Sequence, residues 1–214
     1  MTSAVAGRIV LVAGASSAAG LTTCVSLADA GAHVVAVGSN LERLQAVTAE
    51  ARYVCDLTDL TAVQNLAAQV HNDLGPIDGL IHLVGGWRGG GGLLGQTDED
   101  WDFLHAHVVT TLRNTTRAFN ADLLASPAGR LAIVSSVSVD RPTPGGANYA
   151  AAKAAAETWV GAVAFGFAKA EQAAARIFVV KALDGLEGEL ASGVVGLWDA
   201  PAASVNNTRV VLTA

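Results

Sequence analysis

Short runs of apolar residues alternate along this chain with longer stretches of helical periodicity. The apolar runs cover residues 9–13, 33–37, 52–55, 79–84, 131–135 and 176–180, and a weaker one covers 209–213. Helical patterns lie near 20–30, 41–50, 60–73, 98–119, 149–172 and 188–198. Apolar runs of this length are typical of strands buried on both faces. Their alternation with helices predicts right-handed crossovers and a doubly wound parallel sheet of about seven strands, with helices on both faces, in a single α/β domain.

The composition agrees with one domain of this class and gives no sign of a second. A chain of 214 residues can bury a sizeable core, and 51% hydrophobic residues with 23 glycines and 5% aromatic residues suit parallel strands under alanine-rich helices. The net charge of −6 comes without a basic stripe, so we expect no nucleic-acid partner.

Residues 9–28 carry no charge, a property that signal peptides and membrane spans share. Glycine, serine and threonine residues interrupt the apolar character, so a strand, a turn and a helix are the better interpretation. We therefore expect no membrane segment, no export signal and a cytoplasmic protein. In that compartment Cys24 and Cys55 are expected to be reduced thiols.

A glycine-containing turn, residues 14–20, joins the first predicted strand to the first predicted helix. Free backbone N–H groups and the helix dipole at such a junction can bind a phosphate. A P-loop needs Lys directly after the last glycine, where this chain has Leu21. The remaining interpretations are a dinucleotide site and a connection without a ligand. The candidate binding residues are Gly14, Ser16, Ser17, Ala19 and Gly20.

Tyr149 and Lys153 stand four residues apart at the start of the pattern near 149–172. Positions i and i+4 share one face of a helix, so the ammonium can lie beside the phenol and favour the phenolate over its usual pKa of about 10. Ser136 follows the apolar run before them, and strand ends present reactive groups in α/β sheets. A solvated helix face is the alternative interpretation of the Tyr–Lys pair.

In order and in spacing these motifs resemble the short-chain dehydrogenase/reductase family, from about Gly7 to Val180. The family's T-G-x-x-x-G-x-G lies over residues 13–20, its N-N-A-G over 82–85, and its Ser and Tyr-x-x-x-Lys over Ser136, Tyr149 and Lys153. The resemblance implies a Rossmann-like fold and an NAD(P)-dependent oxidoreductase that interconverts a secondary alcohol and a ketone by hydride transfer. It implies that Tyr149 is the general acid/base, that Lys153 lowers the tyrosine pKa and holds the ribose, and that Ser136 positions the carbonyl.

The end of the second predicted strand bears on the choice of cofactor. An acidic residue there selects NAD through the ribose hydroxyls, whereas a nearby Arg accepts the 2′-phosphate of NADP. This chain has Gly38 at that point, and Ser39, Asn40 and Arg43 follow within reach of a phosphate. We therefore expect NADP, with NAD as the alternative. A solvated surface charge is the other interpretation of Arg43.

Further cofactor contacts follow from the resemblance. Asp56, followed by Leu57, matches the family position that holds the adenine amino group. A helix N-cap is the alternative role of Asp56, and the next polar side chains along the chain compete for that role. In the N-N-A-G segment, Val84 and Gly85 are expected beside the nicotinamide.

The chain departs from the family pattern at several of these positions. Ala18 replaces the middle glycine of the turn and puts a methyl group where the backbone approaches the cofactor. The family's catalytic asparagine should fall near Val108, and the nearest asparagine is Asn114. His107 is a candidate substitute in the water relay that this asparagine supports. Both asparagines of N-N-A-G are also missing.

Two segments near the expected substrate differ as well. After the sixth strand the family has Pro-Gly and a long substrate loop, whereas this chain has residues 181–184, Lys-Ala-Leu-Asp, and a short segment before the last strand. We therefore expect an open pocket. The glycine run at residues 85–92 predicts either a mobile cover carrying Trp87 and Arg88 or a loose connector.

The histidines do not predict a metal site, because His105 and His107 do not share a helix face. We expect them at the surface or at an interface. A relative that binds a dinucleotide or a partner protein without turnover is the alternative to an enzyme acting on a small carbonyl or alcohol. The helices near 98–119 and 149–172 correspond to those that pair between subunits in the family, which implies a homodimer or homotetramer.

Overall fold

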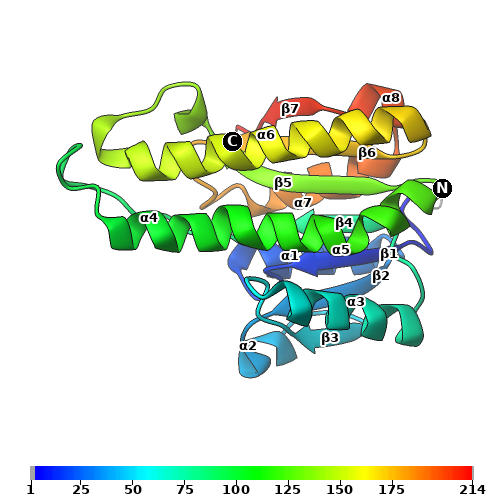
Figure 1. Ribbon diagram of the computed structural model, residues 1–214. Coiled ribbons are helices and arrows are strands. Elements are labelled where there is room, and N and C mark those ends of the chain that lie inside the picture. Colours follow the sequence, from blue (N-terminus) through cyan, green and yellow to red (C-terminus); the bar gives the residue numbers. More distant parts are fainter. Residues whose placement is uncertain (1–2, 214) are drawn as a thin grey trace.

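The computed structural model describes residues 3–213, and its sheet follows the predicted strands (Figure 1). Within that range seven parallel strands lie in the order β3-β2-β1-β4-β5-β6-β7. They are β1 Ile9–Ala13, β2 His33–Gly38, β3 Ala51–Val54, β4 Gly79–His82, β5 Arg130–Ser136, β6 Ala174–Val180 and β7 Thr208–Val211. Each strand overlaps the apolar run that predicted it. The prediction of a single α/β domain with a Rossmann-like parallel sheet is confirmed.

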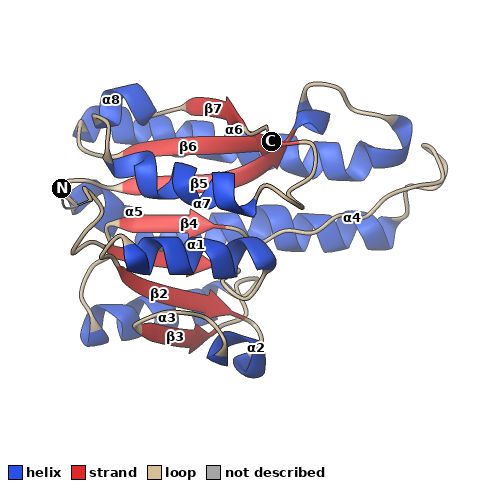
Figure 2. Cartoon of the chain, turned by 180° about the vertical axis from the view of Figure 1, so that it is seen from behind, coloured by secondary structure: helices blue, strands red, loops and turns tan. Residues whose placement is uncertain are grey.

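Helices cover both faces of the sheet, as Figures 1 and 2 show from opposite sides. One face carries α3 Leu60–Asp73, α4 Asp98–Leu104, a π-helical segment His105–Thr110, α5 Thr111–Ala125 and α6 Ala147–Ala170. The other carries α1 Ala18–Asp29, α2 Leu41–Gln45, α7 Glu187–Val195 and α8 Ala202–Val205. Two apolar cores result. Phe119 and Phe167 are fully buried in the first core, and Phe178 lies in the second, on the opposite face of the sheet.

Helix starts follow local capping chemistry. The side chains of Ser17, Asn40, Asp59 and Thr97 accept backbone N–H groups in the first turns of α1, α2, α3 and α4 respectively. Such caps satisfy donors that have no partner inside the helix.

Two helices differ from their predicted extents. The helix expected over 41–50 ends at Gln45, because Arg52 donates to Val47 O (2.6 Å) and Glu50 N to Val34 O (2.9 Å), which draws the chain into β3. The helix expected over 98–119 contains the π-helical segment and continues to Ala125. A π turn inserts an extra residue into the helical repeat and thereby changes which side chains face the sheet.

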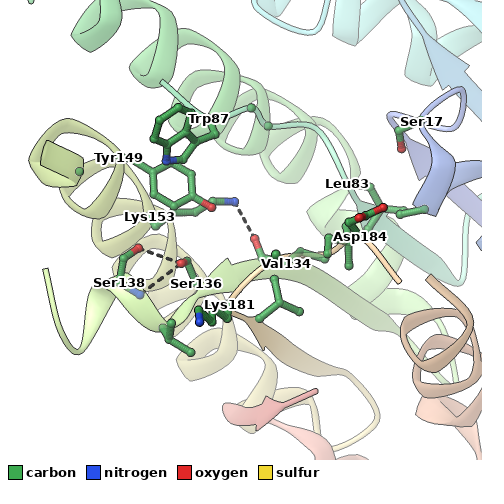
Figure 3. A pocket seen from close by; sticks show the side chains of 18 of the residues that line it. Ser17, Leu83, Trp87, Val134, Ser136, Ser138, Tyr149, Lys153, Lys181 and Asp184 are labelled. Carbon is green, nitrogen blue, oxygen red and sulfur yellow. Dashed lines mark hydrogen bonds between the residues drawn. The ribbon is translucent and has the colours of Figure 1, made fainter. Parts of the chain in front are cut away.

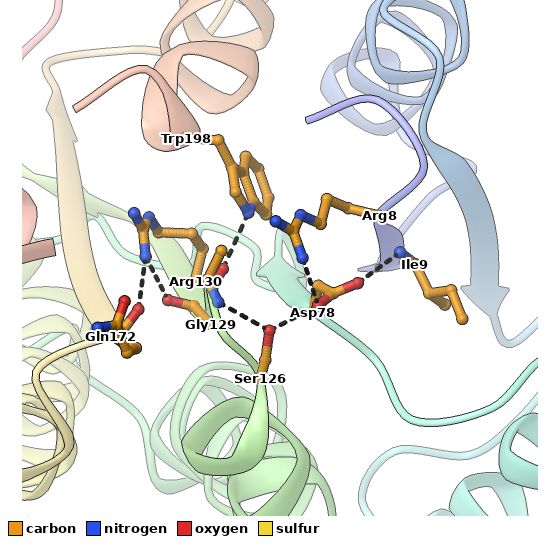
Figure 4. Close-up of polar contacts among 9 residues, drawn as sticks. Arg8, Ile9, Asp78, Ser126, Gly129, Arg130, Gln172 and Trp198 are labelled. Atoms are coloured by element: carbon orange, nitrogen blue, oxygen red, sulfur yellow. Dashed lines mark hydrogen bonds and ion pairs between the residues drawn. The ribbon is translucent and has the colours of Figure 1, made fainter. Parts of the chain in front are cut away.

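The amino ends of the strands are joined by buried and partly buried polar contacts (Figure 4). Asp78, just before β4, accepts from Ile9 N (3.1 Å) and from Ser126 Oγ (2.5 Å). Arg130, at the start of β5, is buried and donates to the carbonyl oxygens of Leu197 (2.7 Å) and of three other residues. Satisfying these groups internally avoids the cost of burying unpaired polar atoms.

Cys24 and Cys55 are buried free thiols. Burial raises the pKa of Cys24 to about 12 and that of Cys55 to about 11, so neither is poised as a nucleophile. Across residues 3–213 no helix is long and apolar enough to cross a membrane. The cytoplasmic location stays a prediction.

Candidate active site

The carboxyl ends of β1, β4 and β5 open onto a cavity of about 880 Å³ (Figure 3). A smaller cavity of about 330 Å³ extends toward the ends of β2 and β3. The two share Ser17, Leu83, Val84 and Gly85, so they form one elongated depression. It lies where the strand order reverses between β1 and β4, which is the position at which open α/β sheets bind ligands.

The turn between β1 and α1 requires glycine at two positions. Gly14 has a φ of +82°, and a Cβ there would lie 3.0 Å from the carbonyl carbon of Leu83. A Cβ on Gly20 would overlap the carbonyl oxygen of Gly14. Ser17 closes the turn, since its Oγ donates to Gly14 O (2.9 Å) and accepts from Gly20 N (3.0 Å). The N-terminus of α1 therefore points into the depression with Ala18 at its tip.

Most of the side chains that the sequence singled out line this depression. They are Gly14, Ser16, Ser17, Ala19, Ser39, Asp56, Leu57, Val84, Gly85, Ser136, Tyr149 and Lys153. Gly20 and Asn40 line neither cavity. Gly20 is packed against the turn backbone, and Asn40 Oδ1 accepts from Arg43 N (2.9 Å) as the cap of α2.

The three predicted catalytic side chains meet in the larger cavity (Figure 3). Ser136 ends β5, and its buried Oγ accepts from the Oγ (2.8 Å) and N (3.2 Å) of Ser138. Tyr149 and Lys153 reach the cavity from successive turns of α6, with Lys153 Nζ 5.7 Å from the centroid of the tyrosine ring. The Lys153 ammonium donates to Val134 O (2.8 Å) on β5.

Burial sets the protonation of the pair. It raises the pKa of Tyr149, and hydrogen bonding to Ser136 acts in the opposite direction. Burial also lowers the pKa of Lys153 to about 8, although the nearby Glu157 carboxylate acts to raise it. In this structure the Lys153 ammonium is bonded to a backbone carbonyl and lies 5.7 Å from the centroid of the tyrosine ring. The lowering of the tyrosine pKa by Lys153 stays a prediction.

Glu157 belongs to a charged cluster that the sequence did not predict. Its carboxylate accepts from Ser135 Oγ (2.5 Å) and pairs with Arg209 on β7, with Nε–Oε2 at 2.9 Å and Nη2–Oε1 at 3.2 Å. Arg209 also bonds Asp140 (3.1 Å). Glu157 stands one helical turn after Lys153, and Ser135 directly precedes Ser136. The cluster therefore fastens α6 to the strand that carries the serine.

The end of β2 presents no carboxylate to the smaller cavity. Gly38, Ser39 and Arg43 line it, and the Arg43 guanidinium donates to Ser16 O (2.9 Å) across the glycine turn. Arg43 is thus held over the cavity by the turn, although its side chain stays exposed. A cation and a hydroxyl at this point suit an anionic group.

Asp56 lines the same cavity and is not a helix cap. Its Oδ1 accepts from Thr58 N (2.9 Å) and Thr58 Oγ1 (2.7 Å), while Asp59 caps α3 through Thr61 N (2.8 Å). These bonds, and the nearby His107 ring, hold the pKa of Asp56 below its usual value. The carboxylate is therefore an acceptor at neutral pH.

His82, in place of the first asparagine of N-N-A-G, is buried between β4 and α5. Its Nε2 lies 3.1 Å from Thr111 Oγ1 and its Nδ1 3.2 Å from Thr115 Oγ1. Burial lowers the pKa of His82 to about 3, so the ring is neutral. Two threonine hydroxyls thus accommodate the replacement.

The position of the family asparagine holds no polar side chain. Val108 is buried in the core, and Asn114 donates to Leu57 O (3.1 Å) and Thr58 O (2.9 Å), away from the larger cavity. His107 lines only the smaller cavity. The interpretation of His107 as a substitute in the water relay is therefore wrong. Its ring is half-buried where it lines the smaller cavity.

The glycine run forms the outer wall of the larger cavity. Trp87 lies beside Tyr149 in Figure 3 and lines the cavity. Gln96 Nε2 donates to Gly90 O (3.0 Å) and Gly145 O (3.1 Å), and its Oε1 accepts from Asn148 N (3.1 Å). The run is thus tied to the start of α6. On the opposite wall Lys181 and Asp184, after β6, are exposed to the cavity.

Comparison with known proteins agrees with this geometry. The model of the short chain dehydrogenase family matches residues 8–180. The 2,3-dihydro-2,3-dihydroxybenzoate dehydrogenase of Bacillus subtilis is 30% identical over 158 residues, which cover 70% of this chain and 60% of the relative. The 3-oxoacyl-(acyl-carrier-protein) reductase of Haemophilus influenzae is 29% identical over 175 residues, 79% of this chain and 69% of the relative.

A solved structure of a metagenomic short-chain oxidoreductase in complex with NADP superposes with a TM-score of 0.87 at 25% identity, covering 99% of this chain and 100% of that one. The curated relatives are longer proteins. The chain spans 60% of the length of the Bacillus dehydrogenase.

Proposed function

Because this chain belongs to the short-chain dehydrogenase family, we propose that it is an NADP-dependent oxidoreductase that interconverts a secondary alcohol and a ketone. The observation that carries the proposal is the meeting of Ser136, Tyr149 and Lys153 in one cavity at the switch point of the sheet. Nothing in the site favours the alternative of a relative without turnover.

In the proposed reaction Tyr149 gives its proton to the carbonyl oxygen, and the neutral phenol that burial favours is the form that can do so. Ser136 polarises the same oxygen from the end of β5. Lys153 supplies the positive charge that stabilises the phenolate left behind. The nicotinamide cofactor supplies the hydride when it is bound.

The depression fits a dinucleotide. Gly14 and Gly20 make a turn that any Cβ would disturb, and the N-terminus of α1 is free to receive a diphosphate. At the other end, Gly38 offers no charge to repel a 2′-phosphate, and Ser39 and Arg43 offer partners for one. The NADP-bound metagenomic relative supports the same choice.

Asn40 is not needed for this binding mode, because its side chain caps α2.

The substrate is proposed to enter between Trp87 and the short segment after β6, where Lys181 stands in place of the family's proline. That segment leaves the cavity open.

We propose a homodimer or homotetramer as the working assembly.

A steady-state assay with NADPH, NADH and a panel of ketones tests the proposal. Tyr149→Phe should lower kcat by about 100-fold or more, the usual contribution of a positioned general acid, while the Kd for NADPH changes little. Tyr53→Phe is the matched control, because the only other tyrosine lies on β3 with its hydroxyl bonded to Asp73. A Tyr149→Phe enzyme that keeps most of its kcat would contradict the assignment.

A further inference from the structure

A second serine lies beside Ser136 and lines the same cavity (Figure 3). Ser138 stands two residues further along, in the helical turn Val137–Val139 that follows β5. Its side chain is half-buried, and its hydroxyl has no hydrogen-bond partner other than Ser136 among residues 3–213. Ser138 can therefore act on Ser136 or on a ligand in the cavity.

Two groups of Ser138 reach the Ser136 hydroxyl oxygen. The helical turn places the Ser138 N–H against Ser136 Oγ with an N–O distance of 3.2 Å, and a backbone N–H can only donate. The two hydroxyl oxygens lie 2.8 Å apart, the usual separation in an O–H···O hydrogen bond. A hydroxyl oxygen accepts two hydrogen bonds and donates one. With both groups of Ser138 as donors, the lone pairs of Ser136 Oγ are filled and its own hydrogen is left for the cavity.

The direction of the bond between the two hydroxyls decides what Ser136 offers to a ligand. If Ser136 donated to Ser138, its single hydrogen would be used inside the turn, and nothing would remain for a carbonyl oxygen, which can only accept. If Ser138 donates, Ser136 is a donor toward the cavity. The hydrogen bond between Ser136 and Tyr149 lowers the pKa of the tyrosine, which is the effect of a donor on the phenol oxygen.

We propose that Ser138 is a positioning residue that turns the hydroxyl hydrogen of Ser136 toward the substrate carbonyl. This inference rests on the proposed function and adds a residue that acts through Ser136 without touching the substrate. A hydroxyl that accepts hydrogen bonds is polarised and becomes a stronger donor. Ser138 therefore both orients and strengthens the bond from Ser136 to the oxygen on which negative charge develops in the transition state.

The main chain around Ser136 is fixed, so its hydroxyl is the part that can turn. Ser136 pairs with Val180 in the parallel register of β5 and β6 and is 4% exposed. Loss of the Ser138 hydroxyl would leave this pairing and the Ser138 N–H in place, and it would free one lone pair of Ser136 Oγ. The expected consequence is a hydrogen that no longer has a fixed direction, with no movement of β5.

Steady-state reduction of ketones with NADPH tests the inference. Ser138→Ala should lower kcat by about three- to tenfold, the effect of one neutral hydrogen bond, and leave the Kd for NADPH nearly unchanged. Ser138→Thr keeps the hydroxyl and should retain most of the wild-type kcat. Ser138→Cys has nearly the size of serine but only a weak donor, so its kcat should resemble that of Ser138→Ala.

A double-mutant cycle with Ser136→Ala separates positioning from other roles. If Ser138 acts through Ser136, Ser138→Ala should cause no further loss of kcat in the Ser136→Ala protein. An equal loss in both backgrounds would indicate packing or direct contact with the substrate and would overturn the inference. An unchanged or higher kcat in Ser138→Ala alone would also overturn it, because Ser136 would then donate to Ser138 in the wild type. Should Ser138→Ala fail to fold, equal kcat values for the Thr and Cys variants would decide against the inference.

A spectroscopic titration of tyrosinate needs no substrate. In the Tyr53→Phe background Tyr149 is the only tyrosine, so the signal belongs to it alone. Adding Ser138→Ala should raise the midpoint of this titration, because Ser136 then donates less strongly to the phenolate. An unchanged or lower midpoint would overturn the inference. A wild type that reduces no ketone with either cofactor would instead overturn the proposed function, and the titration would still test the role of Ser138.

Discussion

At the scale of single residues, the chemistry of the site is controlled by how deeply each side chain is buried. The Lys153 side chain is almost fully buried, and burial lowers its pKa because it disfavours the charged ammonium. The Glu157 carboxylate, one helical turn away, acts to raise the same pKa. His82, on the neighbouring strand β4, stays neutral and adds no competing charge near neutral pH. The balance leaves the pKa of Lys153 at about 8.

This balance predicts an alkaline limit to activity. Lys153 carries its charge below its pKa, so kcat/KM for ketone reduction should fall as pH rises through about 8. Glu157→Gln removes the carboxylate that raises this pKa, and the midpoint should move to lower pH. The measurement is a pH profile of kcat/KM for both proteins.

Asp140→Asn is the control for that profile. Asp140 also pairs with Arg209, but it does not shift the pKa of Lys153. The Asn variant should keep the wild-type midpoint even if its stability falls. Identical midpoints in the wild type and in Glu157→Gln would show that the alkaline limb belongs to another group.

At the scale of elements, different strand ends serve different parts of the proposed cofactor site. In the proposed binding mode the turn after β1 receives the diphosphate, and the end of β2 meets the 2′-position of the ribose. β5 and α6 carry the proposed catalytic side chains. Each task depends on one or two residues that follow a strand, because the carboxyl ends of parallel strands share one edge of the sheet.

The end of β2 should decide between the two nicotinamide cofactors. Gly38→Asp places a carboxylate beside Ser39, and its Cβ meets the side chains of Leu44 (3.2 Å) and Ser16 (3.5 Å) and no backbone atom among its three nearest neighbours. Repulsion of the 2′-phosphate should shift the ratio of kcat/KM for NADH over NADPH upward by about tenfold or more. Gly38→Asn has the same size without the charge and should shift the ratio far less. Equal ratios for both variants would mean that charge at this point does not select the cofactor.

At the scale of the whole molecule, α5 and α6 leave a groove exposed on one face. Trp159 lies in it, bonded to Thr116 Oγ1 (2.9 Å), and Val163 and Gly166 line it as well. Phe165 on the same helix is 70% exposed, whereas Phe167 faces the chain's own core. An exposed aromatic side chain beside an open groove that Trp159, Val163 and Gly166 help to line suits an isologous interface.

We therefore predict a dimer or tetramer in light scattering at micromolar concentration, well above the mass of the 21.6 kDa chain. Gly166→Arg should shift the protein toward the monomer. A side chain at Gly166 meets nothing within 4 Å in the isolated chain, so the variant should fold normally and block only a helix that packs there. Ala68→Arg on α3, also exposed but outside the groove, should leave the mass unchanged. A wild type of monomer mass would rule out the interface.

Features that depend on neighbours along the chain could be predicted from the amino-acid sequence alone. The apolar runs located the strands because a buried parallel strand must be apolar on both faces. The spacing of Gly14 and Gly20 indicated the turn, and that of Tyr149 and Lys153 indicated a shared helix face, because both follow from local backbone geometry.

Other features depended on contacts between distant segments. Glu157 meets Arg209 only because β7 lies beside β6. The π turn before α5 aims His107 at the smaller cavity, although a regular helical repeat over 98–119 gives no sign of it. The register of the strands, the rotation of the helices and the burial of individual side chains arise from packing against segments far along the chain. Local periodicity therefore indicates which elements form, and packing decides which side chains meet and how desolvation shifts their pKa values.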